Sequence, residues 1–200
     1  MPVDKKAFEK DIKRICGVFG KNKTFRKRCM DATMCQYHKC NPELDAYRSS
    51  MLTKDEREEC DKSKNYFKCV MDKAKEKGTH DKHAMLNHCI ANKCPEDLQF
   101  TIEFNKKIHE EFSKRNECKP CQTLLEESDK ANIDSIIQTN ECNKKHTTAK
   151  DQEKCIKKYS KKMYAKIGAF HKCKVIHCPV KSSKHNQSNK NTKKTSKSSK

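Results

Sequence analysis

The chain has 200 residues, with 46 Lys and Arg against 27 Asp and Glu, a net charge of +19 and 14 cysteines. Its hydrophobic fraction of 33% includes those cysteines and it has no Trp, which excludes a large apolar core of the usual kind. A chain this polar needs covalent or metal cross-links, or it stays partly disordered. Only the cysteines can provide such links.

The first half of the chain carries helix signals at three places. Near the start, three apolar side chains are spaced for one face of a helix, namely Phe8, Ile12 and Ile15. Further on, Thr53-x-x-Glu56 has the form of a capping box, which begins a helix, and Gly78 is expected to end it.

The second half carries two longer apolar patterns. Residues 98–104 alternate as strand residues do, but the pattern continues at helical spacing through Phe104, Ile108 and Phe112. A sustained stripe at intervals of three and four follows later, at Ile156, Tyr159, Met163, Ile167 and Phe170. Both patterns favour helix.

The cysteines form three related tetrads and one separate pair. The tetrads are Cys16, Cys29, Cys35 and Cys40; Cys60, Cys69, Cys89 and Cys94; and Cys142, Cys155, Cys173 and Cys178. Each follows the pattern Cys-x(8 or 12)-Cys-x(5 to 19)-Cys-x4-Cys and is closed by a proline. Such repetition indicates a stacked array of supersecondary units, in which terminal copies are often atypical.

We therefore predict an all-α fold, an array of short helical hairpins stapled by disulfides and followed by a disordered basic tail. The cysteine pattern and the composition divide the chain into five segments. They are an atypical first cysteine unit (1–41), a second unit (42–96), a helical linker with Cys118-Lys-Pro-Cys121 (97–140), a third unit (141–180) and a Lys/Ser/Asn tail (181–200).

The second unit suggests a nested pair of disulfides around Gly78. A hairpin turning there would bring Cys69 opposite Cys89, with Cys60 and Cys94 as an outer bridge. Each such bridge contributes about 2 to 4 kcal/mol. Each tetrad nevertheless permits three connectivities, and the sequence does not choose among them.

The third unit differs, because Cys155 and Cys173 are 18 residues apart. That interval is about five whole turns, so both lie on one face of an uninterrupted helix. This copy can therefore bridge to a neighbouring unit.

The sharpest local motif is Cys118-Lys-Pro-Cys121, which resembles the active dithiol of thioredoxin-like oxidoreductases. That resemblance implies a first cysteine at a helix N-terminus, where its pKa is lowered. The alternating strands and helices of that fold are absent, so a structural disulfide or half of a metal site is favoured. A zinc-stabilised nucleic-acid-binding module is a further alternative, with Cys118, Cys121, Cys142 and His146 as ligands.

Positive charge is concentrated at the two ends. Residues 1–41 carry +7, residues 42–140 carry −3, residues 141–180 carry +8 and the tail carries +7. We expect contact with polyanions through charge alone, against the alternatives of a solvated helix face and a solubilising tail. The candidate residues are Lys21, Lys23, Arg26, Lys27, Arg28, Lys190, Lys193, Lys194, Lys197 and Lys200.

The compartment poses a conflict. The first residues are charged and lack the apolar run of a secretory signal, and no stretch is apolar enough to span a membrane. We therefore expect neither an export signal nor a membrane span. Disulfides are rare where thiols are kept reduced. The cysteines would then bind metal, become oxidised in the mitochondrial intermembrane space, or be oxidised in the cytoplasm by enzymes that a virus encodes.

Two families show partial resemblance. Paired cysteines on stapled helices resemble the coiled-coil-helix-coiled-coil-helix proteins of the intermembrane space, but spacings of x8, x12 and x4 depart from their twin Cys-x9-Cys or Cys-x3-Cys pattern. A Cys-dense, Lys/Asn/Ser-rich chain with a basic tail looks more like virion proteins of giant nucleocytoplasmic DNA viruses. That resemblance implies oxidation by viral sulfhydryl oxidases in the cytoplasm.

The sequence thus predicts a non-enzymatic structural protein of a virion or similar assembly, with no catalytic residue, metal or cofactor. Its partners would be other structural proteins and, without sequence specificity, the backbone of nucleic acid. No phosphate-binding loop, nucleophile elbow, zinc-protease, kinase or Rossmann motif occurs. The mitochondrial intermembrane space and the cytoplasm are the alternative locations, and a thiol–disulfide oxidoreductase using Cys118 and Cys121 is the alternative activity.

Overall fold

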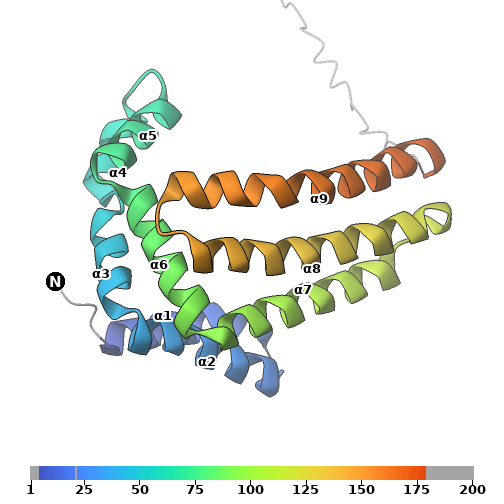
Figure 1. Cartoon of the computed structure of the whole chain (residues 1–200), viewed down its shortest axis with the longest axis horizontal. Helices are drawn as coiled ribbons and strands as arrows, with labels where there is room; N and C mark the ends of the chain where they lie inside the picture. Colours follow the sequence, from blue (N-terminus) through green and yellow to red (C-terminus); the bar gives the residue numbers. More distant parts are fainter. Residues whose placement is uncertain (1–4, 21, 179–200) are drawn as a thin grey trace, which may run out of the picture.

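The computed structural model describes residues 5–20 and 22–178, and all their regular structure is helical, as predicted (Figure 1). The predicted tail at 181–200 lies outside these residues. The elements are α1 (Lys5–Cys16), η1 (Gly17–Phe19), α2 (Lys23–Lys39), α3 (Asn41–Ser50), α4 (Lys54–Asp61), α5 (Tyr66–Glu76), α6 (Thr79–Lys93), α7 (Pro95–Arg115), η2 (Lys119–Cys121), α8 (Gln122–Lys145) and α9 (Ala149–His177).

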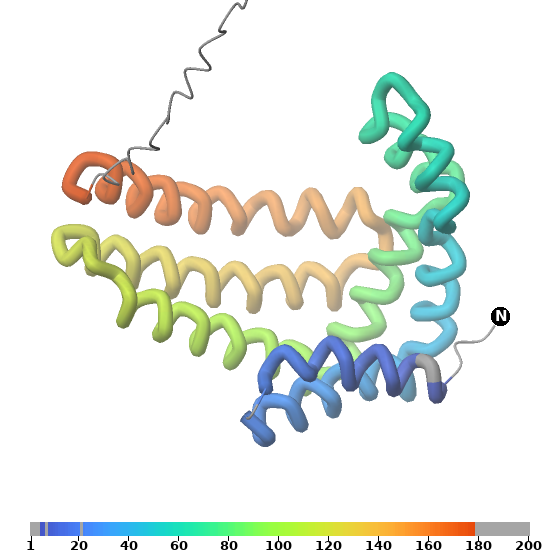
Figure 2. The backbone as a smooth tube through the Cα atoms, turned by 180° about the vertical axis from the view of Figure 1, so that it is seen from behind, coloured from blue at the N-terminus to red at the C-terminus, as the bar shows by residue number. Residues whose placement is uncertain are grey.

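The helices form a three-helix layer and a group of shorter helices packed across one end of it. Helices α7, α8 and α9 lie side by side, and short connections make each neighbour antiparallel (Figures 1 and 2). Helix α6 crosses the end of this layer, with α3 along its other side, while α1 and α2 pack near the beginning of α7. Helices α4 and α5 project at a corner of the molecule.

Disulfides make up much of the core, as the composition suggests. The larger apolar side chains that are buried in the described residues are few, namely Phe8, Ile12, Leu44, Leu86, Leu125 and Phe170. The other buried apolar side chains are cysteines and alanines, and the cysteines contact the larger side chains in two clusters. Cross-links therefore contribute stability that apolar burial alone would not supply.

The local signals near the N-terminus are confirmed with one exception. Phe8 and Ile12 are 3% and 2% exposed in α1, but Ile15 is 55% exposed. Ile15 lies within about 20° of Phe8 around the helix axis, so it shares the buried face. It is the next-to-last residue of α1, so the burial of this face does not extend to the end of the helix.

The start at Thr53 and the stop at Gly78 are confirmed, but the single helix expected between them is two helices, α4 and α5, separated at residues 62–65. Thr53 and Glu56 form a capping box at the start of α4. Gly78 separates α5 from α6 with φ +62°, a left-handed conformation that favours glycine. The ambiguous run at 98–112 lies within α7, and the stripe at 156–170 lies within α9, where Phe170 is buried.

The cysteine units are repeats of the sequence, but their boundaries do not coincide with the ends of helices. The segment boundaries after residues 41, 96 and 140 fall inside α3, α7 and α8. None of the helices in the described part of the chain is long and apolar enough to cross a bilayer.

Candidate functional site

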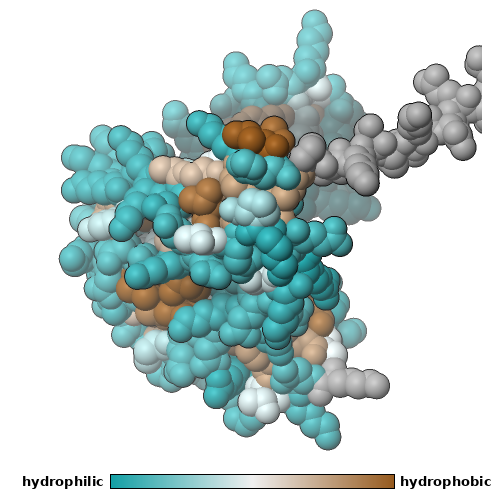
Figure 3. All heavy atoms as spheres, turned by 90° about the vertical axis from the view of Figure 1, so that its right-hand side faces the viewer, coloured by the Kyte–Doolittle hydropathy of each residue, from teal (hydrophilic) through white to brown (hydrophobic). Residues whose placement is uncertain are grey.

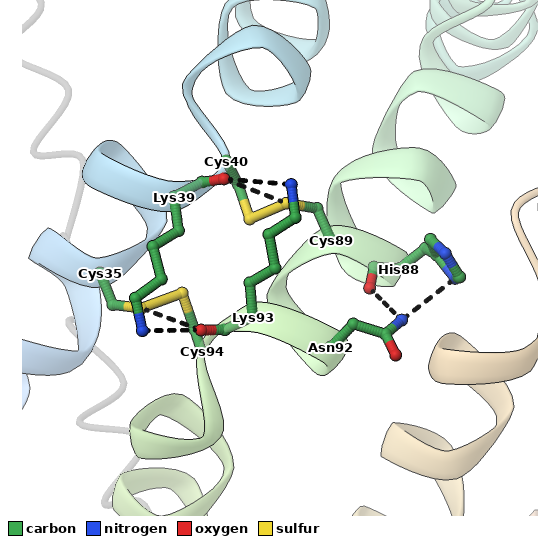
Figure 4. Close-up of a disulfide and its surroundings, with 8 residues drawn as sticks. All are labelled: Cys35, Lys39, Cys40, His88, Cys89, Asn92, Lys93 and Cys94. Atoms are coloured by element: carbon green, nitrogen blue, oxygen red, sulfur yellow. Dashed lines mark hydrogen bonds between the residues drawn. A yellow bond between two sulfur atoms is a disulfide. The ribbon is translucent and has the colours of Figure 1, made fainter.

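Two parallel disulfides join the end of α2 to the end of α6, and we call them the first clamp. They are Cys35–Cys94 and Cys40–Cys89, with Cα–Cα distances of 5.8 and 5.9 Å. Each cysteine of one Cys-x4-Cys segment bonds the opposite cysteine of the other, so the two segments run antiparallel (Figure 4).

The first clamp has local two-fold character, because its two halves make the same interactions. Lys39 Nζ donates to the carbonyl oxygen of Lys93 at 2.9 Å, and Lys93 Nζ donates to that of Lys39 at 3.5 Å (Figure 4). Each lysine thus binds a free carbonyl at the C-terminus of the partner helix, where positive charge is favourable. Each helix ends at a lysine that is followed by a capping cysteine, and a proline occupies one of the first two positions of the helix that follows.

A second clamp joins η2 to the end of α9 through Cys118–Cys178 and Cys121–Cys173. The predicted dithiol is therefore not bonded to itself, although the Sγ atoms of Cys118 and Cys121 lie only 3.3 Å apart. Both are buried, at 2% and 0% exposed, against Leu125 and Phe170.

A buried asparagine fixes the loop that carries the second clamp. Asn116 Oδ1 accepts from the backbone N–H of Cys118 at 3.3 Å, while its Nδ2 donates to Cys118 O and to Gln122 Oε1. These bonds add to the backbone hydrogen bonds of the loop, in which Lys119 N–H donates to Glu117 O and Cys121 N–H to Cys118 O. Figure 3 views this end of the molecule, where small hydrophobic patches interrupt a hydrophilic surface; Val175 and Ile176 at the end of α9 are 74% and 70% exposed.

The remaining three bridges lie within tetrads, and each joins consecutive helices at their connection. They are Cys16–Cys29, Cys60–Cys69 and Cys142–Cys155. One rule therefore covers all three repeats: the first two cysteines pair with each other, and the last two bond outside the tetrad. All fourteen cysteines are in bridges.

The nested pairing around Gly78 is wrong. Cys69 bonds Cys60, because Cys60 near the end of α4 and Cys69 in the first turn of α5 meet across a short turn. Cys89 and Cys94 face α2, since α6 crosses the end of the layer beside it. In the third unit, Cys173 does bridge to a neighbouring segment, whereas Cys155 stays within its tetrad.

The zinc set of Cys118, Cys121, Cys142 and His146 is not brought together. Cys121 precedes α8 while Cys142 and His146 lie at its other end, and a 24-residue helix is about 36 Å long. The spacing was acceptable for a flexible loop, but this segment is one rigid helix. In the described residues, one cluster places three metal-ligating atoms close together, Cys40, Glu43 and Cys89, and its two sulfurs are bonded to each other.

The predicted basic cluster on α2 is exposed but partly neutralised. Lys27 pairs with Asp31 at 2.7 Å, and Arg28 pairs with a carboxylate oxygen of Glu103. Lys23 and Arg26 complete the described part of the cluster. The other candidates lie outside the described residues: Lys21, Lys190, Lys193, Lys194, Lys197 and Lys200.

A second basic surface was missed, and it lies on α9. Lys150, Lys154, Lys157 and Lys161 are exposed and recur at intervals of four, three and four, which places them along one face; we call them the lysine row. Lys157 pairs with Glu153, and no ion pair within the described residues engages the other three. The charge of +8 on residues 141–180, combined with the helical period, was the signal that could have found this row.

Two ionisable groups with shifted pKa values, Asp97 and His83, line a cavity of about 570 Å³ between α1–α3 and α6–α8. Burial raises the pKa of Asp97, and a hydrogen bond from Gln36 Nε2 at 2.9 Å opposes that rise. Burial also lowers the pKa of His83, whose ring stacks on Tyr47 with centroids 4.8 Å apart. These groups join the helices around the cavity through polar and aromatic contacts.

An Asp–His pair lies between α7 and α8. His109 Nδ1 is 2.7 Å from Asp129 Oδ1, and burial raises the pKa of Asp129 while His109 lowers it. His109 Nε2 lies 2.9 Å from Asn132 Nδ2, so the amide can donate to it and both ring nitrogens are engaged. With both nitrogens occupied, the pair links the two helices and offers no free base.

No family model, curated protein or solved structure matches this chain.

Proposed function

We propose that the protein is a non-enzymatic structural component of a virion or a similar assembly, and that it contacts nucleic acid through the phosphate backbone. The cross-linked helices would provide the scaffold and contact other structural proteins. The observation that carries the polyanion contact is the lysine row of α9.

The row suits a regular polyanion in both charge and length. The four lysines of the row lie along one face of α9. Lys172 extends this exposed basic face to a length of about 33 Å along the helix, close to one turn of duplex DNA. The row faces solvent, so its lysines can exchange counterions for phosphates. Helix α9 carries nine lysines against Asp151 and Glu153.

Disulfides support the row because they fix α9 at both ends. Cys142–Cys155 holds the N-terminal part of the helix to α8, and the second clamp holds its C-terminal end to η2. A rigid row loses little conformational entropy on binding, which is favourable for association.

The test compares two variants with the same change in charge. Lys150→Gln, Lys154→Gln and Lys161→Gln remove charge from the row, while Lys62→Gln, Lys64→Gln and Lys68→Gln remove it from exposed positions near α5. Binding to random-sequence duplex DNA is measured by fluorescence anisotropy over a salt series. We expect the row variant to reduce the slope of log K against log salt by up to about 2.7, since each phosphate contact contributes about 0.9.

The control variant should keep a slope close to that of the wild type. Equal losses in the two variants would show that net charge, and not the row, governs binding. Failure of the wild type to bind at low salt would refute the polyanion contact altogether.

A further inference from the structure

We propose that the second clamp is a thiol–disulfide exchange site for a small dithiol, in which opening one bridge causes the Cys118-Lys-Pro-Cys121 pair to open the other. This inference does not depend on the proposed function. It rests on the contact between two sulfurs that belong to different bridges: Cys118 Sγ lies 3.3 Å from Cys121 Sγ.

The two sides of the clamp differ in access. Cys118 and Cys121 are 2% and 0% exposed, whereas their partners on α9, Cys173 and Cys178, are partly exposed. A thiol from solution therefore reaches the α9 sulfurs first. Attack at Cys173 Sγ forms a mixed disulfide there and releases Cys121 as a thiolate.

The released thiolate is placed to react further. Cys121 is the N-cap residue of α8, and the free N–H groups at the start of this 24-residue helix stabilise a negative charge. Apart from Cys173 Sγ, which it has just left, the sulfur placed for attack is Cys118 Sγ at 3.3 Å. Attack there forms the Cys118–Cys121 bond and breaks Cys118–Cys178, and the departing Cys178 thiolate takes a proton from water.

The second thiol of the reagent completes the reaction. It attacks the mixed disulfide, so Cys173 leaves as a thiol and the reagent closes into a cyclic disulfide. The dithiol loses two electrons and two protons, and two protein bridges become one Cys118–Cys121 bridge and two thiols on α9. A single exchange thus frees the C-terminal end of α9, while Cys142–Cys155 still holds its beginning.

The first clamp is an internal comparison, because it lacks a Cys-x2-Cys pair. Both of its segments have the x4 spacing, and its bridges join α2 to α6 crosswise. Reduction of one of its bridges should therefore yield the two cysteines of that bridge as thiols.

The experiment maps the first cysteines to become reactive. The native chain is treated with increasing dithiothreitol, quenched with acid, alkylated with N-ethylmaleimide and digested without further reduction for mass spectrometry. We expect the first product of the second clamp to carry alkyl groups on Cys173 and Cys178 and an intact Cys118–Cys121 disulfide. Alkylation of Cys121 and Cys173 with Cys118–Cys178 intact, or of all four cysteines at once, would overturn the proposal.

A double variant, Cys118→Ala with Cys178→Ala, removes the sulfur that Cys121 attacks. In it, Cys121 and Cys173 should both be alkylated when their bridge opens. Protection of Cys121 in this variant would also contradict the mechanism. The wild-type map decides the question by itself if the variant does not fold.

Discussion

The two bridges of the first clamp should contribute unequally to stability, depending on the order in which they are removed. Cys35–Cys94 and Cys40–Cys89 span 59 and 49 residues. When one is present, however, the other closes only a short covalent path of about 12 residues in the unfolded chain, through the two Cys-x4-Cys segments. Loop entropy then predicts that removing the first bridge lowers the free energy of unfolding by about 3 kcal/mol and that removing the second lowers it by about 4 kcal/mol.

Guanidinium denaturation of three variants measures this difference. The variants are Cys40→Ala with Cys89→Ala, Cys35→Ala with Cys94→Ala, and the combination of all four substitutions. Either double variant should keep the m value of the wild type, because its unfolded chain is still closed into a loop, whereas the fourfold variant should show a larger m value.

The reasoning fails if the first removal lowers the free energy of unfolding as much as the second, or if either double variant raises the m value. Replacing cysteine by alanine deletes buried atoms in both steps, so that contribution largely cancels in the comparison. A matched reference is Cys16–Cys29, which closes a separation of only 13 and whose span overlaps that of no other bridge.

Three further predictions concern single residues. The pKa of Glu56 is lowered from 4.5 to about 2, first by the hydrogen bond from Lys77 and then by the capping-box bond from the backbone N–H of Thr53. The stability that these bonds supply is therefore present above pH 4.5 and should be lost as the pH falls to about 2. Glu56→Gln should abolish that loss in denaturation curves over this range. Burial raises the pKa of Asp97, so the Asp97→Asn variant should melt at pH 7 no lower than the wild type. Any gain in its melting temperature over the wild type should shrink as the pH falls, and a lower melting temperature of the variant at pH 7 would contradict this. Gly78→Ala should lower the free energy of unfolding by about 1–2 kcal/mol; the positive φ at this position is the only cause, since a Cβ there meets no atom within 4 Å. Gly78→Asn should lower the free energy of unfolding less, because asparagine adopts positive φ more readily than alanine.

The sequence was sufficient for features that depend on neighbouring residues. Helical spacing, the capping box at Thr53 and the stop at Gly78 are local, and so is the shared face of Cys155 and Cys173 on one helix. Such features need no knowledge of how distant helices pack. They therefore gave the all-α fold and the continuous α9.

The disulfide pairing could not be derived in the same way, because it depends on tertiary packing. The bond between Cys89 and Cys40 requires that α6 crosses beside α2, and no spacing within the tetrads encodes that crossing. The zinc hypothesis failed for a related reason, since the interval from Cys121 to Cys142 is a rigid helix. The lysine row was accessible from the sequence, but only if charge had been counted along the helical period.

The uneven span of the bridges sets an order for oxidation during biosynthesis. The three bridges within tetrads have separations of 9 or 13 and can close soon after their helices are synthesised. Cys40 must remain available while 49 further residues are made, and Cys118 while 60 are made. An oxidant that acts too early would therefore join Cys35 to Cys40, or Cys118 to Cys121, before their native partners exist. Correct maturation requires either delayed oxidation or a thiol catalyst that reverses such pairs.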